Sequence, residues 1–302
     1  MTENVKSQLI IILDTNPVWW GQRPSSHSKA QQKMTLTECL NSVMVFAHSH
    51  IMMNHSNKLA ILAAHSDQSV FLYPKNVASN PGLSEENGTT EGNDGKYELF
   101  TQVDKQIKEG IQSLIDNCMN GQLYPDSLIA GAMTMALCYI NKAEKSHEES
   151  GILSSRILVI KGSEDNTEQY MNLMNAVFTA QKQNVVIDAC ILDNDSGLLQ
   201  QACDITGGIY LKIPQMKGLL QYLLWVFLPD PLERPKLTLP PKVQVDYRAA
   251  CFCHRNLIDI GYVCSVCLSI FCAFSPICGT CQTTFKIFGP PKGVKKKSKK
   301  PL

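Results

Sequence analysis

Seven of the chain's twelve cysteines lie within residues 251–281, and four of them form two C-x-x-C pairs. Cys264 pairs with Cys267, and Cys278 pairs with Cys281. Each pair places two thiolates on one tight turn, which is the local geometry of tetrahedral Zn²⁺ sites. The spacing therefore predicts a small module organised around zinc, with these four cysteines as the metal ligands.

Four further side chains in this segment can bind zinc, namely Cys251, Cys253, His254 and Cys272. Together the eight groups suffice for two ions, and the sequence leaves the second site open. A disulfide cluster is the alternative, and it belongs to secreted proteins. The early apolar run, Leu9–Leu13, is too short for a signal-peptide core. No stretch approaches the ~18 apolar residues of a membrane helix. We therefore expect reduced thiols, a location in the cytosol or nucleus, and no membrane partner.

The charge of the chain is unevenly distributed. The net charge is +1, but the residues after Phe285 carry seven lysines and no acid, so the remainder is +1 − 7 = −6. This predicts a basic disordered tail over residues 286–302, which serves either as a nuclear-import signal or as a contact to nucleic acid. Any DNA contact is expected to be indirect or through this tail.

Residues 8–228 alternate between strand-like and helix-like patterns. The strand-like runs are continuously apolar, as is typical of strands covered on both faces. The predicted strands are Leu9–Leu13, Leu59–Ala64, Val70–Tyr73, Ile157–Ile160, Val185–Leu192 and Ile209–Ile213. Their alternation with amphipathic helices predicts an α/β fold, with a mostly parallel sheet and helices on both faces.

Capping residues locate several of the helices. Thr35 followed by Glu38 is a capping-box pattern, and Asn166 and Ser196 are expected to begin two later helices. Gly207 and Gly208 are expected to end the second of these by adopting left-handed backbone. In the helix after Asn166, four side chains are expected to be buried: Met171, Met174, Val177 and Phe178.

Two segments interrupt this pattern and suggest domain boundaries. Residues 74–97 are polar and rich in Gly and Asn, which predicts a flexible insertion. Residues 229–248 contain five prolines and predict an extended linker. The expected organisation is thus an α/β domain over residues 1–228, the linker, a cysteine-rich zinc finger over 249–285, and the basic tail.

The first strand and a later helix–strand segment resemble the von Willebrand factor A domain. The resemblance rests on Asp14 at the end of the first strand and on the sequence from Leu199 to Tyr210. Many members of that family bind Mg²⁺ through an Asp-x-Ser-x-Ser loop, but here Asn16 and Val18 occupy the serine positions. Lys161 stands where an acid would be expected. Because a hard cation requires oxygen ligands, we expect no Mg²⁺ site and a structural role for Asp14.

Sequence signatures of common enzymes are absent. There is no Walker loop, no G-x-G-x-x-G, no G-x-S-x-G and no H-E-x-x-H. We therefore expect no catalytic residue and no small-molecule substrate. Four histidines are expected at the surface or the sheet edge: His48, His50, His55 and His65. Trp19 and Trp20 either pack over the sheet edge or contact a partner.

Four segments, together with the domain order, are similar to the thirty-four-kilodalton subunits of general transcription factor TFIIH. These segments are Asn16–Trp20, Ser155–Ile160, Leu198–Asp204 and Asp246–His254. The resemblance implies a non-catalytic subunit of the TFIIH core, acting in the nucleus in RNA polymerase II transcription initiation and nucleotide excision repair. It also implies that the A domain binds the forty-four-kilodalton subunit, itself an A-domain and zinc protein.

A RING-type ubiquitin ligase is the alternative function. The eight candidate ligands could form a cross-brace, in which Cys264, Cys267, Cys278 and Cys281 make one site. The first pair, in Cys251-Phe252-Cys253, has one intervening residue where a RING has two, which argues against this alternative.

Overall fold

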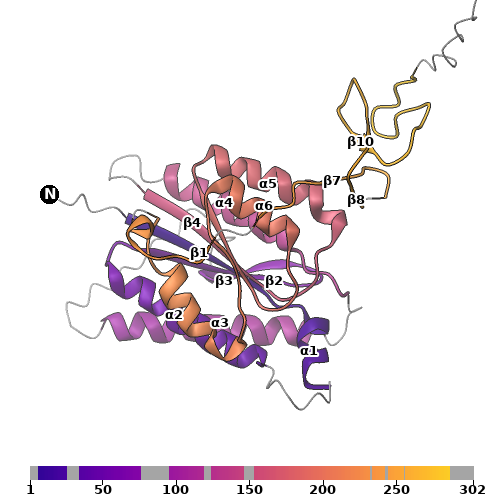
Figure 1. Ribbon diagram of the computed structural model, residues 1–302. Coiled ribbons are helices and arrows are strands. Elements are labelled where there is room, and N and C mark those ends of the chain that lie inside the picture. The colour runs from indigo at the N-terminus through magenta and orange to yellow at the C-terminus, as the bar shows by residue number, and fades with distance from the viewer. Residues whose placement is uncertain are drawn as a thin grey trace, which may run out of the picture. The chain divides into compact units, whose positions relative to one another are not determined.

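The computed structural model describes residues 6–25, 34–75, 95–118, 124–145, 153–231, 233–241, 244–254 and 256–285. The chain divides into two compact units, Met1–Asp246 and Tyr247–Leu302, which we consider separately (Figure 1). Most of the insertion expected at 74–97 and the whole lysine tail, 286–302, lie outside the described residues. The last residues of that expected insertion, from Gly95 onward, begin a helix.

The first unit is built on a six-stranded sheet with the order β3-β2-β1-β4-β5-β6. Its strands are β1 (Lys6–Asp14), β2 (Lys58–Ala64), β3 (Ser69–Tyr73), β4 (Leu153–Lys161), β5 (Val186–Ile191) and β6 (Tyr210–Lys212). All pairings are parallel except that of β2 with β3. The predicted α/β fold, a von Willebrand factor A-like sheet, is confirmed.

Helices cover both faces of this sheet (Figure 1). They are α1 (Pro17–Ser25), α2 (Leu36–Met53), α3 (Gly95–Cys118), α4 (Ile129–Lys145), α5 (Tyr170–Lys182), α6 (Gly197–Thr206) and α7 (Leu219–Tyr222). Successive residues of a strand point to opposite faces. Accordingly Ile11 of β1 packs in the cluster with α2, α3 and α7, whereas Ile10 packs in the cluster with α4, α5 and α6.

The predicted caps are present. Thr35 and Glu38 form a complete capping box at the start of α2, and the Ser196 hydroxyl accepts a hydrogen bond from the Leu199 amide at the start of α6. Gly207 ends α6 with a φ of 73°. Asn166 caps a short 3₁₀ turn, Thr167–Gln169, that precedes α5.

The buried face of α5 differs in part from the prediction. Met174 and Val177 are buried as expected, but Met171 and Phe178 are 41% and 48% exposed. The buried stripe of α5 also includes Leu173, Ala176 and Ala180. An amphipathic helix buries one stripe of its surface, and Met171 and Phe178 stand beside this stripe rather than on it.

The proline-rich segment that follows the last helix is fixed to the first unit rather than fully extended. A π-helical turn, Leu223–Phe227, is followed by a 3₁₀ turn, Arg234–Lys236. The Arg234 guanidinium donates to both carboxylate oxygens of Asp188 in β5, and both side chains are buried. None of the helices in the described part of the chain has both the length and the apolar composition required to cross a bilayer.

The second unit contains two very short hairpins. They are formed by β7 (Ala249–Ala250) with β8 (Leu257–Ile258), and by β9 (Tyr262–Val263) with β10 (Ile270–Phe271). Among its described residues, the buried apolar side chains are those of Cys251, Cys264 and Cys278. A unit of this size without a larger apolar core requires another source of stability, such as a bound metal.

Candidate metal centres and the edge of the sheet

The carboxyl ends of β1 and β4 meet at the point where the strand order of the sheet reverses. In open α/β sheets, ligands bind at this position. Asp14 ends β1 and Lys161 ends β4. The residues singled out by the resemblance to the A domain are therefore brought together at the expected edge.

The Asp14 carboxylate is fully engaged by donors of the protein itself. One oxygen accepts hydrogen bonds from the backbone amide of Asn16 at 3.1 Å and from the Ser127 hydroxyl at 2.6 Å. The other accepts from the backbone amides of Gly162 at 3.1 Å and Ser163 at 2.8 Å. Four donors at a buried carboxylate agree with the structural role predicted for Asp14.

The Asn16 side chain also stabilises the loop that follows β1. Its side-chain oxygen accepts from the amides of Val18 and Trp19, which caps a helix, α1, where the sequence predicted a loop. Its side-chain amide donates to the Pro125 carbonyl at 2.6 Å. An asparagine therefore links two segments at a position where the resemblance to the A domain would place a metal-binding serine.

The tryptophan pair packs over this edge. Trp20 is buried and its indole N–H donates to the Asp14 carbonyl at 2.9 Å. Trp19 lies edge-on to Trp20 and packs on the core. A Cβ atom at Gly162 would lie 2.2 Å from the Trp19 ring, so glycine is required there. Packing over the sheet edge is thus confirmed for the pair, with Trp20 buried and Trp19 partly buried.

Lys161 is buried and pairs with a carboxylate that the sequence reasoning missed. Its ammonium group contacts Asp165, four residues further along the chain, and the Ser196 hydroxyl donates to the same carboxylate at 2.7 Å. The i, i+4 spacing of Lys161 and Asp165 was the available signal, but it is common on surfaces. At this edge of the sheet, the Lys161 ammonium group thus supplies a positive charge, which is paired with Asp165 of the same chain.

Two of the four histidines, His50 and His65, are buried rather than at the surface, although His65 directly follows β2 and so lies at the sheet edge as one alternative predicted. His65 is buried, with Nδ1 2.9 Å from the Thr15 carbonyl and Nε2 3.1 Å from Cys118 Sγ. His50 is also buried. Burial, and then the positive charge of Arg156, lowers the pKa of His50 to about 4. Sequence alone did not indicate this burial because it depends on contacts between segments far apart in the chain.

In the second unit, the four predicted zinc ligands come together. The ligand atoms of Cys264, Cys267, Cys278 and Cys281 all lie within 4.8 Å of one another. The sulfur atoms of Cys264 and Cys281 are 3.7 Å apart, and those of Cys267 and Cys278 are 3.5 Å apart. Tetrahedral zinc with Zn–S distances of ~2.3 Å separates its sulfurs by ~3.8 Å, whereas a disulfide bond is ~2.05 Å long. The residues therefore fit a zinc ion and are not disulfide-bonded.

The two C-x-x-C turns have the same local structure. In each, the amide of the first cysteine donates to the carbonyl five residues later, Ser269 in one turn and Thr283 in the other. The hydroxyl of that residue lies 3.1 Å from the sulfur of the second cysteine. Hydrogen bonds from Ser269 lower the pKa of Cys267 to about 6. The thiolate is the metal-binding form of cysteine, so the hydrogen bonds from Ser269 favour metal binding by Cys267.

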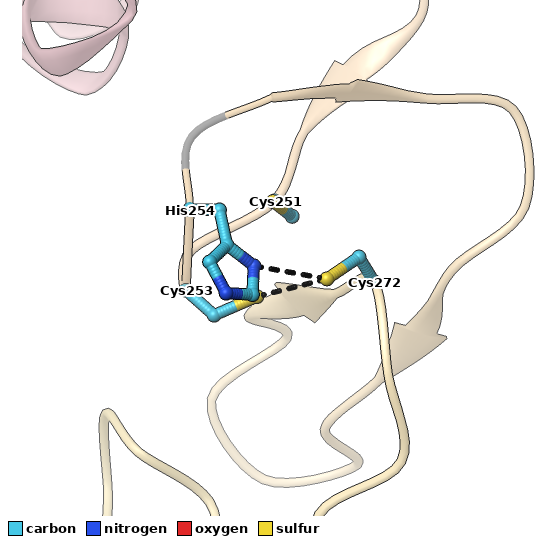
Figure 2. A group of neighbouring side chains, drawn as sticks. All are labelled: Cys251, Cys253, His254 and Cys272. Atoms are coloured by element: carbon cyan, nitrogen blue, oxygen red, sulfur yellow. Dashed lines mark hydrogen bonds between the residues drawn. The ribbon is translucent and has the colours of Figure 1, made fainter.

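The four additional side chains also form a cluster (Figure 2). The ligand atoms of Cys251, Cys253, His254 and Cys272 lie within 4.8 Å of one another. Spacing had left this second site open because its members follow no C-x-x-C pattern.

Comparisons with known proteins place these features in one family. Residues 6–282 match the family model described as transcription factor Tfb4. The subunit tfb4 of general transcription and DNA repair factor IIH from Schizosaccharomyces pombe is 39% identical over 281 residues, covering 93% of this chain and 89% of that protein. The TFB4 subunit from Arabidopsis thaliana is 36% identical, covering 92% and 89%.

A solved structure agrees with these sequence matches. The crystal structure of the TFIIH p34 N-terminal domain superposes with a TM-score of 0.61 at 30% identity, covering 74% of this chain and 99% of that one. The six-stranded sheet, the closed loop at Asp14 and both cysteine clusters lie within the residues matched by the family model, so the chain belongs to the transcription factor Tfb4 family.

Proposed function

We propose that this chain is a non-catalytic subunit of the general transcription and DNA repair factor TFIIH, acting in RNA polymerase II transcription initiation and nucleotide excision repair. Family membership supports the assembly, since the similar proteins are named as subunits of that factor. The closed hydrogen-bond network around Asp14 supports the non-catalytic role. It turns the part of the sheet that binds ligands in related folds into a fixed surface.

The first unit binds the forty-four-kilodalton A-domain and zinc subunit through this fixed surface. The loops at the edge are held by Asp14, Asn16 and the Lys161–Asp165 pair, so little conformational entropy is lost when a partner docks. Because these contacts use no divalent cation, binding is independent of Mg²⁺. Pull-down of the forty-four-kilodalton subunit should give equal yields in buffers with and without Mg²⁺. Recovery only in the presence of Mg²⁺ would contradict this mode of binding.

The second unit binds one zinc ion through Cys264, Cys267, Cys278 and Cys281. The support is the tetrahedral spacing of the four sulfurs and the repeated turn that presents each pair. Zinc binding in small finger peptides contributes about 10–16 kcal/mol, and this energy is folding energy. The ion therefore has a structural role and offers no open position for chemistry.

The chain acts in the nucleus, as its place in TFIIH requires. The lysine-rich segment 286–302 serves as an import signal or a contact to nucleic acid. Fluorescence microscopy of the tagged full chain, compared with a variant whose seven tail lysines are changed to glutamine, tests the import role. Equal nuclear fluorescence of the wild-type chain and the variant would mean that the lysine tail is not the import signal.

Ubiquitin-ligase activity is the second candidate function, and the chain order of the two cysteine clusters favours it. Cys272 of one cluster lies between Cys267 and Cys278 of the other, which is the interleaving of a cross-brace. Incubation of the full chain with ubiquitin, activating enzyme and a panel of conjugating enzymes tests this activity. Under the adaptor proposal, no conjugates accumulate above the level without the chain.

Purification of the tagged full chain from nuclear extract tests the main proposal. We expect the other subunits of TFIIH, including the forty-four-kilodalton subunit, to co-purify in fixed proportion through a gel-filtration step. An untagged extract serves as the control. Recovery of the chain alone, or with unrelated proteins only, would contradict the proposal.

A further inference from the structure

We propose that Cys251, Cys253, His254 and Cys272 form a second tetrahedral zinc site, so that residues 249–285 are a two-zinc module. The inference extends the zinc binding proposed above and rests on a different set of residues. It does not depend on the partner of the chain.

The four side chains have the geometry of a metal site. Figure 2 shows them gathered around one space between the Cys251–His254 loop and the chain that follows β10. The sulfurs of Cys253 and Cys272 are 3.3 Å apart, and His254 Nδ1 is 3.2 Å from the Cys272 sulfur. Around tetrahedral zinc, sulfur–sulfur and sulfur–nitrogen separations are ~3.8 Å and ~3.6 Å. The cluster needs a shift of only a few tenths of an ångström to reach these values.

The first loop is a variant of the two C-x-x-C turns. The Cys251 amide donates to the carbonyl of Asn256, five residues later, as the first cysteine of each other turn does. His254 therefore occupies the fourth position of the turn, where Cys267 and Cys281 stand in the others. The ligand pair is C-x-x-H, and Cys253 adds a third ligand on the same turn. The single residue between Cys251 and Cys253 is thus no obstacle to a site.

The fourth ligand is held in place by backbone contacts. The Phe252 amide donates to the Ile270 carbonyl at 2.7 Å, which fixes the first loop against β10. Cys272 follows β10 directly. Its sulfur is thereby placed opposite the Cys251–His254 loop.

The need for stability points to the same conclusion. The first hairpin, β7 with β8, lies outside the span from Cys264 to Cys281, so no ligand of the four-cysteine site holds it. The large side chains nearby are exposed, including Leu257 at 45% and Ile260 at 89%. A second ion ties this hairpin to the loop between the two C-x-x-C turns, because Cys272 belongs to that loop.

The ligand set selects the metal. Three thiolates and one imidazole in a tetrahedral arrangement suit zinc, and no ligand position is left open for water or substrate. The exposed Cys253 thiol, close to two others, would be prone to oxidation without a metal. The site is accordingly structural.

Counting zinc in the purified full-length chain tests the proposal. Elemental analysis against quantitative amino-acid analysis should give two zinc ions per chain for the wild type and one for Cys272→Ser. Cys138→Ser, which removes an exposed cysteine of α4 outside both clusters, is the matched control and should retain two. A wild-type value of one, unchanged in Cys272→Ser, would overturn the second site while leaving the four-cysteine site intact. A wild-type value near zero would overturn both.

Two variants at His254 distinguish the loss of a metal ligand from general misfolding of the unit. His254→Cys supplies another zinc ligand and should retain two ions, whereas His254→Ala should lose one or both. In the cobalt-loaded chain, His254→Cys should shift the ligand-field bands toward those of a four-thiolate site. Equal zinc content and equal cobalt spectra in both His254 variants would show that this side chain binds no metal and would overturn the proposed ligand set.

Discussion

Single residues at the sheet edge explain the structural role of the loop that follows β1. Asp14 receives four hydrogen bonds from the chain, and Lys161 supplies a positive charge that is neutralised by Asp165. Both side chains are buried, so loss of either charge leaves unpaired groups in a medium of low dielectric.

Asp14→Asn should therefore lower the free energy of unfolding by about 2 kcal/mol, because an amide group cannot accept all four hydrogen bonds. Urea denaturation followed by circular dichroism measures this change. Asp67→Asn, in an exposed turn, is the matched control and should change stability by less than ~0.5 kcal/mol. Added Mg²⁺ should not alter the midpoint of either variant or of the wild type. A midpoint that rises with Mg²⁺ in the wild type alone would show that Asp14 binds the cation.

His50 makes the stability of the first unit depend on pH. Its pKa falls from 6.5 to about 4 on folding, so the unfolded chain binds the proton more tightly. Stability is then fully present above pH ~6.5 and decreases as the pH falls toward 4, by about 3 kcal/mol in total. His50→Gln should remove this part of the acid sensitivity, whereas His55→Gln, at an exposed position, should leave it unchanged. Urea denaturation between pH 7 and pH 4 measures the slope, and parallel curves for wild type and His50→Gln would exclude His50 as the cause.

Short elements hold distant parts of each unit together. The 3₁₀ turn Arg234–Lys236 is joined to β5 by the Arg234–Asp188 pair, and the C-x-x-C turns each place a non-glycine residue at a φ of 59°, Leu268 and Gln282. Neither feature follows from the periodicity of the sequence. The Arg234–Asp188 pair joins residues 46 positions apart, and the positive φ values depend on the shape of the C-x-x-C turns.

Arg234→Met should destabilise the first unit by roughly 3–5 kcal/mol, since it leaves the Asp188 carboxylate buried without its partner. Thermal or urea unfolding measures the loss. Lys236→Met, which removes an exposed lysine of the same turn paired with Glu233, should cost less than about 1 kcal/mol. Equal effects of the two substitutions would mean that Arg234 contributes only as a surface charge.

Leu268→Gly should stabilise the zinc-bound second unit by about 1 kcal/mol, because glycine adopts positive φ without the steric cost of a Cβ atom. Leu268 is exposed, so little packing is lost. Competition with a chromogenic chelator should show slower zinc loss than in the wild type. Leu268→Val, with a β-branched side chain at the same φ, should show faster loss. The opposite order would indicate that the leucine side chain itself protects the ion.

At the scale of the whole molecule, the sequence predicted what depends on local pattern. Continuous apolar runs located the strands, and the C-x-x-C spacing located four cysteines that do come together. It could not predict the helix beginning at Pro17, the docking of the proline-rich segment or the burial of His50 and His65. These features are set by contacts between segments far apart in the chain. The second cluster was visible only as a set of suitable side chains, since its C-x-x-H turn and Cys272 share no common spacing.

The two units should also unfold separately. The described apolar core clusters of the first unit contain no residue of the second, and we expect the second unit to depend on bound zinc for its stability. Cys267→Ser removes a ligand of the four-cysteine site and should raise hydrogen exchange throughout residues 249–285 to the level of an unfolded chain. Exchange in β1 and β4 should remain as slow as in the wild type. Cys138→Ser, outside both clusters, should change neither region. If Cys267→Ser instead released protection in β1, the first unit would depend on the zinc module for its stability, and the separation of the two units would be wrong.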